Sequence, residues 1–135
     1  IIRVLGHVVI ITLWTEIVRI LFQRVDAHQL APVVLAAHNG RGYFYRVLMN
    51  ALNNIGQADR FSSVVTTFID TLPLCRDKLP ERESHRMEAL LTDLLGIPFT
   101  HDALKDARAL DRLLTAIDVQ PEDLGKHAFA PSAAN

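Results

Sequence analysis

The sequence predicts an α/β fold with a mixed or parallel sheet. Three observations lead to this class. Short apolar runs rich in β-branched residues alternate along the chain with apolar stripes at helical spacing. Of the 135 residues, 50% are apolar and 21% are charged, which is enough apolar material for a buried core. The length suits one domain, and a single cysteine, Cys75, excludes an internal disulfide framework.

The N-terminal part predicts a strand followed by a helix. Residues 8–12 are mostly β-branched, which favours a buried strand. Residues 14–25 carry apolar side chains at helical spacing, with charged side chains off that stripe. Charged residues also interrupt the stretch 1–22, and each would cost about 2.5–3.5 kcal/mol at the centre of a bilayer. A membrane-spanning helix is therefore not expected here, and no membrane partner is expected.

The middle of the chain predicts a second strand and a second helix. Residues 33–37 form a continuous apolar run, which the turn sequence His-Asn-Gly at 38–40 ends. A helical stripe then covers 44–55, and Gly56 is suited to the left-handed position that follows a helix.

The remaining elements follow in the second half. Residues 64–69 predict a third strand, and 70–80 predict a polar connection with about one helical turn. Two helices come next. Ser84 can cap the first, which Gly96 ends, and Thr100 can cap the second.

The expected organisation is one domain over residues 1–118 and a weakly ordered tail over 119–135, where Pro, Gly, Ala and Ser are common. Because the chain begins at Ile1, we expect a fragment, a processed product or an incomplete gene model. The net charge of −1 argues against a general electrostatic attraction to nucleic acid, although it leaves room for a local patch.

One local pattern carries chemistry. Residues 101–106 fit His-x-Ala-x-x-Asp at the start of the last predicted helix. A helix would place His101 and Asp106 little more than one turn apart, where they could reach one pocket. The histidine could activate water and the carboxylate could bind a hard cation. The same pattern also fits a capped helix start with exposed polar side chains, and the residues alone leave both readings open.

Three segments together carry a resemblance to a known family: Ala-His-Asn-Gly at 37–40, Ile-Asp-Thr-Leu at 69–72, and the motif that contains His101 and Asp106. Their order and spacing resemble the second half of the DnaQ-like, or DEDDh, 3′–5′ exonucleases, over about residues 14–117. The resemblance implies an RNase H-like three-layer fold, truncated at its N-terminus, with a mixed sheet flanked by helices.

The resemblance also implies a chemistry. The family holds two Mg²⁺ or Mn²⁺ ions with four carboxylates, which clamp the attacking and leaving oxygens of a phosphodiester. By resemblance, His101 is the general base and Asp106 the last metal-binding carboxylate. Asp70 is expected to cap a helix or form a turn and not to bind metal.

Two departures weaken the implied activity. Phe44 stands where the family has a metal-binding aspartate, and no Asp-x-Glu motif occurs in residues 1–16. In the family that motif lies upstream, so truncation could explain its absence, but truncation cannot explain Phe44. We therefore expect His101 and Asp106 to be vestiges and expect no cofactor, or two Mg²⁺ or Mn²⁺ ions if the chain is active. The matched segments are most similar to a divergent branch, the exonuclease-like C-terminal domains of the promyelocytic leukaemia protein and its fish relatives, which is regarded as inactive.

The resulting expectation is a catalytically degenerate domain that acts as an interaction module for single-stranded nucleic acid or for protein, in the nucleus or cytoplasm. His38, Asn39 and Tyr43 are candidate nucleic-acid contacts. Two of them, His38 and Asn39, could instead satisfy backbone groups, while Tyr43 and Tyr45 could stack on bases or seal a vestigial cleft. The alternatives are a truncated active exonuclease, or a half of a larger sheet without an independent role.

Overall fold

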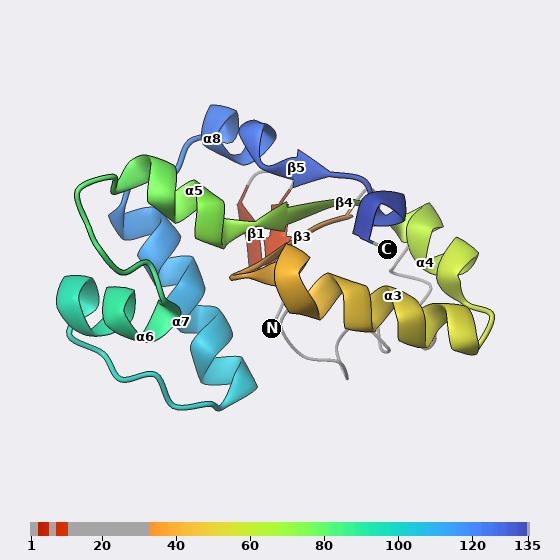
Figure 1. Ribbon diagram of the computed structural model, residues 1–135, viewed down its shortest axis with the longest axis horizontal. Helices are drawn as coiled ribbons and strands as arrows, with labels where there is room; N and C mark the ends of the chain where they lie inside the picture. Colours follow the sequence, from red (N-terminus) through yellow and green to blue (C-terminus); the bar gives the residue numbers. More distant parts are fainter. Residues whose placement is uncertain (1–2, 6–7, 11–32, 135) are drawn as a thin grey trace.

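The computed structural model describes residues 3–5, 8–10 and 33–134. Five strands form one sheet in the order β1-β2-β3-β4-β5. They are β1 (Arg3–Leu5), β2 (Val8–Ile10), β3 (Val33–Ala37), β4 (Val65–Asp70) and β5 (Ala128–Phe129). Strand β3 runs parallel to β2 and β4, whereas β1 and β5 pair antiparallel at the two edges (Figure 1). The predicted α/β class with a mixed sheet is confirmed.

A helical crossover joins the parallel strands β3 and β4, because parallel neighbours cannot be connected by a tight turn. It consists of the π-helical turn η2 (Gly40–Phe44), α3 (Tyr45–Asn54) and α4 (Ala58–Val64). A second helical group follows β4. Its members are α5 (Thr71–Lys78), α6 (Met87–Leu90), the π-helical turn η3 (Leu91–Leu95) and α7 (Ala103–Ala116).

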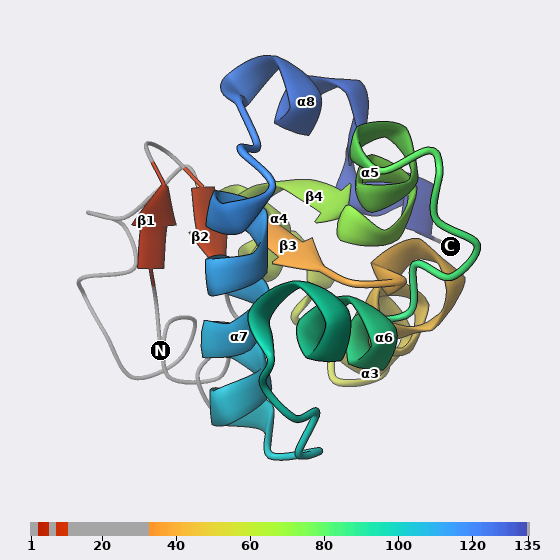
Figure 2. The ribbon, with the colours of Figure 1, turned by 90° about the vertical axis from the view of Figure 1, so that its left-hand side faces the viewer.

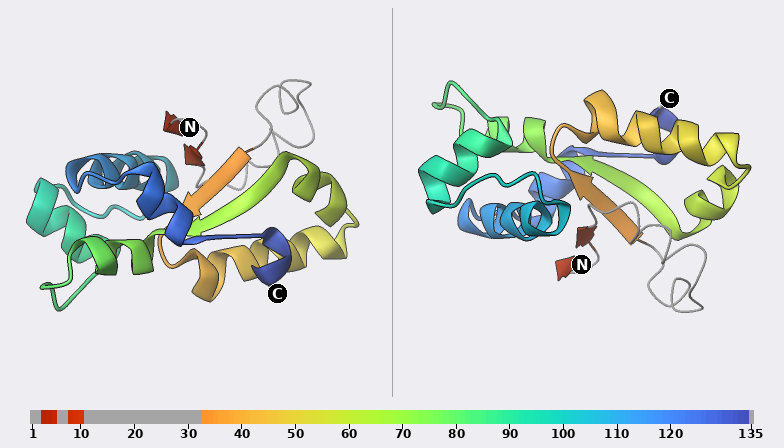
Figure 3. Two further views of the ribbon diagram at one scale, coloured as in Figure 1. Left: turned by 90° about the horizontal axis from the view of Figure 1, so that it is seen from above. Right: turned by 90° about the horizontal axis from the view of Figure 1, so that it is seen from below.

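The helices cover both faces of the sheet. Leu35 and Phe68 belong to a core cluster with α3 and α4, whereas the next residues along the strands, Ala36 and Ile69, belong to a second cluster with α5, α6, η3 and α7. This alternation follows from the two-residue period of a strand. Figure 3 shows α3 and α7 on opposite sides of the sheet, and Figure 2 looks onto α7 with β1 and β2 beside it.

Most predicted elements in the described part of the chain are confirmed. Strands form at Val33–Ala37 and Val65–Asp70, and the helix predicted over 44–55 is present as α3. Gly56 and Gly96 have φ angles of +69° and +65°, so both end their helices in the left-handed conformation that glycine favours. Strand β2 covers part of the strand predicted at 8–12. The helix predicted over 14–25 lies outside the described residues.

The region after β4 differs from the prediction. The connection over 70–80, where about one helical turn is expected, contains the eight-residue helix α5, which buries Leu74 and Cys75. Burial raises the pKa of the Cys75 thiol to about 12, so the thiol is protonated at neutral pH. Helix α4 was not predicted at all. None of the helices in the described ranges combines the length and the apolarity needed to cross a membrane.

The helix caps also differ from the prediction. Helix α7 is capped by Asp102, whose Oδ1 accepts a hydrogen bond from the backbone N–H of Lys105 at 3.0 Å, and not by Thr100. Helix α6 begins at Met87 with Arg86 as its N-cap, and Ser84 lies two residues before that cap.

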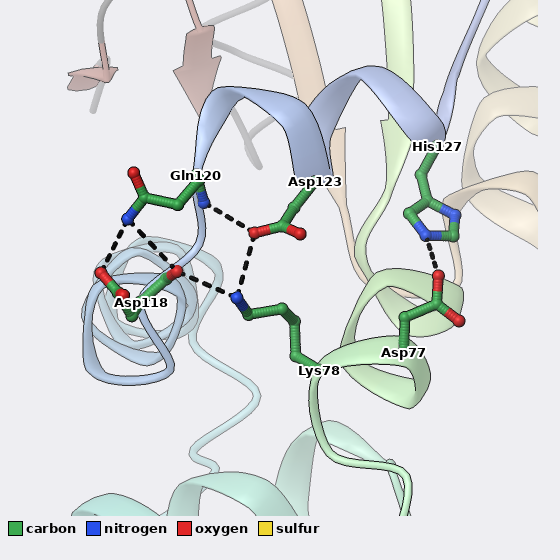
Figure 4. Close-up of polar contacts among 6 residues, drawn as sticks. All are labelled: Asp77, Lys78, Asp118, Gln120, Asp123 and His127. Carbon is green, nitrogen blue, oxygen red and sulfur yellow. Dashed lines mark hydrogen bonds and ion pairs between the residues drawn. The ribbon is translucent and has the colours of Figure 1, made fainter.

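The C-terminal segment, for which the sequence predicts weak order, forms regular elements in the structure. We call residues 119–134 the C-terminal strap. It contains α8 (Pro121–Lys126), strand β5 and the 3-10 turn η4 (Pro131–Ala134). An ion pair and a hydrogen bond join the strap to α5: Lys78 Nζ lies 3.1 Å from Asp123 Oδ2, and His127 Nε2 lies 2.7 Å from Asp77 Oδ2 (Figure 4).

The strap also adds an aromatic contact to the core. Strand β5 pairs with β4 through Phe68 and Phe129, and the Phe129 ring lies edge-on to the rings of Phe68 and Tyr45 at 5.8 and 5.7 Å. The guanidinium of Arg41 lies 4.5 Å from the centre of the Phe129 ring, in a cation–π contact. The strap therefore covers one edge of the sheet and reaches the loop that follows β3.

Candidate functional site

A pocket of about 620 Å³ lies where β3 ends, bounded by the helices that pack on the second face of the sheet. Six apolar residues line it: Ala37, Phe44, Leu72, Met87, Phe99 and Leu110. Eight polar or charged residues complete the lining: His38, Asn39, Arg76, Glu83, Ser84, His85, Arg86 and Asp106. An apolar lining with a few polar groups is typical of a ligand-binding pocket.

The pocket brings together residues that are far apart in the sequence. His38, Asn39, Phe44 and Asp106, all singled out from sequence, line it. His101 and Tyr43 do not belong to its lining. Phe44 and Asp106, which lie 62 positions apart in the sequence, therefore line the same pocket.

His38 ties three segments together. Its Nε2 lies 2.7 Å from the carbonyl oxygen of His85, which can only accept, so Nε2 carries the proton and donates. Its Nδ1 lies 2.9 Å from the Thr71 hydroxyl, which donates to it. Both ring nitrogens are thus engaged inside the protein. The end of β3, the start of α5 and the connection before α6 are held in one arrangement.

Burial lowers the pKa of His38 below its ordinary value of 6.5. The unfolded chain therefore takes up a proton on His38 at a higher pH than the folded chain does. As the pH falls below about 6.5, this difference lowers the free energy of unfolding until His38 is protonated in the folded state as well.

We expect this pH dependence to disappear in His38→Gln. The free energy of unfolding of the wild-type chain should fall more steeply than that of the variant between neutral pH and about pH 5, so that the gap between them narrows. Urea unfolding at several pH values measures this. His101→Gln, which removes an exposed histidine, is the control and should follow the wild type. Parallel wild-type and His38→Gln profiles would contradict the expectation.

Asp70 has a structural position, as the sequence predicts. It is the N-cap of α5, and its Oδ1 accepts a hydrogen bond from the backbone N–H of Leu72 at 3.0 Å. Its Oδ2 accepts a second hydrogen bond, also at 3.0 Å, from the backbone N–H of Arg41. Both carboxylate oxygens are therefore used to join the loop after β3 to the start of α5.

The loop after β3 depends on small residues. Asn39 has a φ angle of +58°, a left-handed conformation that asparagine tolerates. Gly40 is buried, and a Cβ at this position would lie 2.4 Å from Cε2 of Tyr45. The absence of a side chain at Gly40 is what lets the Tyr45 ring approach the loop. Tyr45 itself is fully buried, so it cannot stack on a base, whereas Tyr43 is 70% exposed.

Asp106 lies in the first turn of α7 and is half-buried. Its Oδ1 accepts hydrogen bonds from the backbone N–H and the hydroxyl of Thr100, each at 3.2 Å. The carboxylate thus holds the loop before α7 against the helix. His101 is exposed, has a φ angle of +59°, and packs its ring against Phe99 at 4.5 Å between centroids. The structure therefore separates the two residues of the motif, because only Asp106 lines the pocket.

Phe44 gives the pocket an apolar wall in place of a carboxylate. Its ring lies edge-on to Tyr45 at 5.5 Å and packs against the first core cluster. Within the described ranges, no three His, Cys, Asp or Glu side chains come together as a group that could hold a metal ion. Phe44 offers no ligand atom, both carboxylate oxygens of Asp70 accept backbone hydrogen bonds, and Oδ1 of Asp106 accepts from Thr100.

Several pocket residues were not found from sequence. Met87, Arg86 and Leu110 lie within predicted helices, and Leu72 and Arg76 lie in the predicted polar connection, so none of them was marked as a site residue. Thr71 and the carbonyl of His85, which hold His38, gave no signal, because a threonine and a backbone group are not distinctive. No model of a known protein family matches the chain, and no curated protein sequence matches it either.

Proposed function

We propose that this chain is an exonuclease-like domain of the RNase H-like fold that has lost metal-dependent catalysis and acts as an interaction module for nucleic acid or protein. The observation that carries the proposal is Phe44, which lines the same pocket as Asp106 at the position where a metal-binding aspartate is expected. The parallel pair β3 and β4, with polar residues after each strand, supports the family assignment. The similarity to the exonuclease-like domain of the promyelocytic leukaemia protein and its fish relatives is part of this proposal, as is a location in the nucleus or cytoplasm.

The proposed loss of activity follows from ligand number. Affinity for Mg²⁺ depends on the number and charge of the oxygen ligands. The pocket lining contains two arginines, Arg76 and Arg86, and two carboxylates, Glu83 and Asp106. It therefore has no excess of negative charge to attract divalent cations. The Phe44 ring also lacks the side-chain oxygen with which an aspartate at this position would bind a metal ion.

A nuclease assay tests the proposal. Single-stranded DNA and RNA are incubated with the chain and Mg²⁺ or Mn²⁺, with and without any segment that its gene encodes before Ile1. We expect no release of mononucleotides from the wild type and none from Phe44→Asp. Tyr43→Asp is the matched control, because it adds the same carboxylate at an exposed position outside the pocket lining.

The alternative is a truncated active 3′–5′ exonuclease in which Phe44 is a local departure. It predicts mononucleotide release by the wild type that Asp106→Ala abolishes and Phe44→Asp increases. That result would overturn the proposed loss of catalysis.

A further inference from the structure

Five large apolar side chains of the pocket lining are together called the apolar floor below. Phe44, Leu72 and Met87 contribute from η2, α5 and α6, and Phe99 and Leu110 contribute from the loop before α7 and from α7 itself. A methionine and two phenylalanine rings can enclose one bulky apolar side chain, since methionine adapts its shape and aromatic rings supply a large contact area.

Two cations of the same lining have no carboxylate partner among the residues that the structure describes. Arg76 and Arg86 line the pocket and are exposed, and neither guanidinium forms a hydrogen bond or ion pair in the part of the chain that the structure describes. The nearby Arg82 differs, because its Nη2 pairs with Asp93 Oδ2 at 2.7 Å. Arg76 and Arg86 are therefore free to bind a planar carboxylate in the two-point geometry that arginine favours.

The charge around the pocket favours a peptide over a nucleic-acid backbone. Glu83 and Asp106 also line it, so a chain with a phosphate at every residue would meet two carboxylates along with the two guanidiniums. Nucleic-acid affinity depends on neutralising many phosphates at once. A peptide with a carboxylate next to one apolar residue needs only the two guanidiniums and the apolar floor.

The pocket is also held in shape before a ligand arrives. The hydrogen bonds of His38 to Thr71 and to the carbonyl of His85 fix the wall between β3 and α6, and Asp106 fixes the loop before α7. A preorganised site loses less conformational entropy on binding.

From these observations we propose that the pocket binds a short linear peptide of a partner protein, which places one bulky apolar side chain on the floor and a neighbouring carboxylate on Arg76 and Arg86. This inference rests on the proposed function, because it assumes a pocket that binds without cleaving phosphodiesters.

Fluorescence anisotropy tests the proposal with labelled peptides in which one central apolar residue (leucine, methionine, phenylalanine or tryptophan) is flanked by glutamates. We expect at least one of these acidic probes to bind. Binding should be lost when alanine replaces the central residue, and should be much weaker when lysines replace the glutamates. The proposal is wrong if no acidic probe binds more tightly than its lysine counterpart.

A double variant that reverses the charge of both arginines tests whether the peptide binds at this pocket. Arg76→Glu/Arg86→Glu should weaken binding of the acidic probe about tenfold or more and strengthen binding of the lysine probe. The matched control is Lys105→Glu/Arg108→Glu, which makes the same change of charge at exposed positions of α7 outside the pocket lining and should leave both affinities unchanged. Circular dichroism checks that both double variants are folded. Equal loss in the two double variants would show a general charge effect and contradict the proposal.

An assay with oligothymidylate that has a free 3′ end distinguishes failure of the peptide inference from failure of the proposed function. If it binds, is weakened by Arg76→Glu/Arg86→Glu and is not degraded, while the acidic peptides do not bind, the occupant is nucleic acid and the peptide inference is wrong. In that case the proposed loss of catalysis still holds. If the oligonucleotide is degraded in the presence of Mg²⁺, the proposed function itself is wrong.

Discussion

Replacing Tyr45 by alanine is expected to lower the free energy of unfolding by about 3–5 kcal/mol, the range for loss of a large aromatic side chain from a core. Tyr45 is fully buried, and its ring stacks on Phe68 with centroids 4.0 Å apart. Its hydroxyl lies 2.8 Å from the carbonyl oxygens of Leu35 in β3 and Ile69 in β4. The side chain therefore supports both parallel strands at once.

Tyr45→Phe separates the ring from the hydroxyl. It keeps the stacking on Phe68 and removes only the hydrogen bonding, so we expect a loss of about 1–2 kcal/mol. Urea unfolding followed by circular dichroism measures both variants. Tyr43→Ala serves as the control and should stay within about 0.5 kcal/mol of the wild type, because that side chain is exposed. Equal losses for Tyr45→Ala and Tyr45→Phe would contradict this division.

Gly40→Ala is expected to destabilise the fold by about 1–3 kcal/mol, the range for overpacking a well-filled site. The added Cβ would lie 2.4 Å from Cε2 of the Tyr45 ring, which is buried and enclosed by Phe68 and Phe129. The ring can yield only by disturbing the core. Because Gly40 does not have a positive φ angle, the cost comes from this close approach and not from backbone strain.

Gly42→Ala is the matched control for Gly40→Ala. Its Cβ would lie 2.7 Å from Oδ1 of Asn39, the end of an exposed side chain that can turn away. We expect a change within about 0.5 kcal/mol. Thermal unfolding of the two variants compares them directly. A larger loss for Gly42→Ala than for Gly40→Ala would show that the contact with Tyr45 does not limit the packing of this loop.

The strands and α3 could be predicted because their signals are local. The run at 33–37 is apolar, short and ended by His-Asn-Gly, and the stripe over 44–55 has helical spacing. Helix α5 is longer than the single helical turn predicted there, because Pro73 and the polar composition suggest a connection. Pro73 lies in the first turn of α5, where a backbone N–H has no helical partner and proline is tolerated. Helix α4 buries only Phe61 and Val64, so its period is too weak to detect.

The pocket and the strap could be predicted only in part, because both depend on contacts between distant segments. The sequence singled out His38, Phe44 and Asp106 for separate reasons, and the structure brings them into one pocket. The sequence did not predict that His101 would lie outside the pocket lining, because its position depends on its left-handed backbone conformation and on its contact with Phe99. The strap has a polar, proline-containing sequence and is fixed by partners on α5 and β4.

The C-terminal strap has a practical consequence for solubility. Strand β4 is the last long strand of the sheet, and β5 covers its outer edge at Phe68 and Ile69. A fragment that ended before residue 128 would present unpaired N–H and C=O groups beside the aromatic side chains of Phe68 and Tyr45. Such an edge pairs readily with strands of other molecules and leads to aggregation. Strand β5 therefore limits aggregation of the folded protein through the edge of β4.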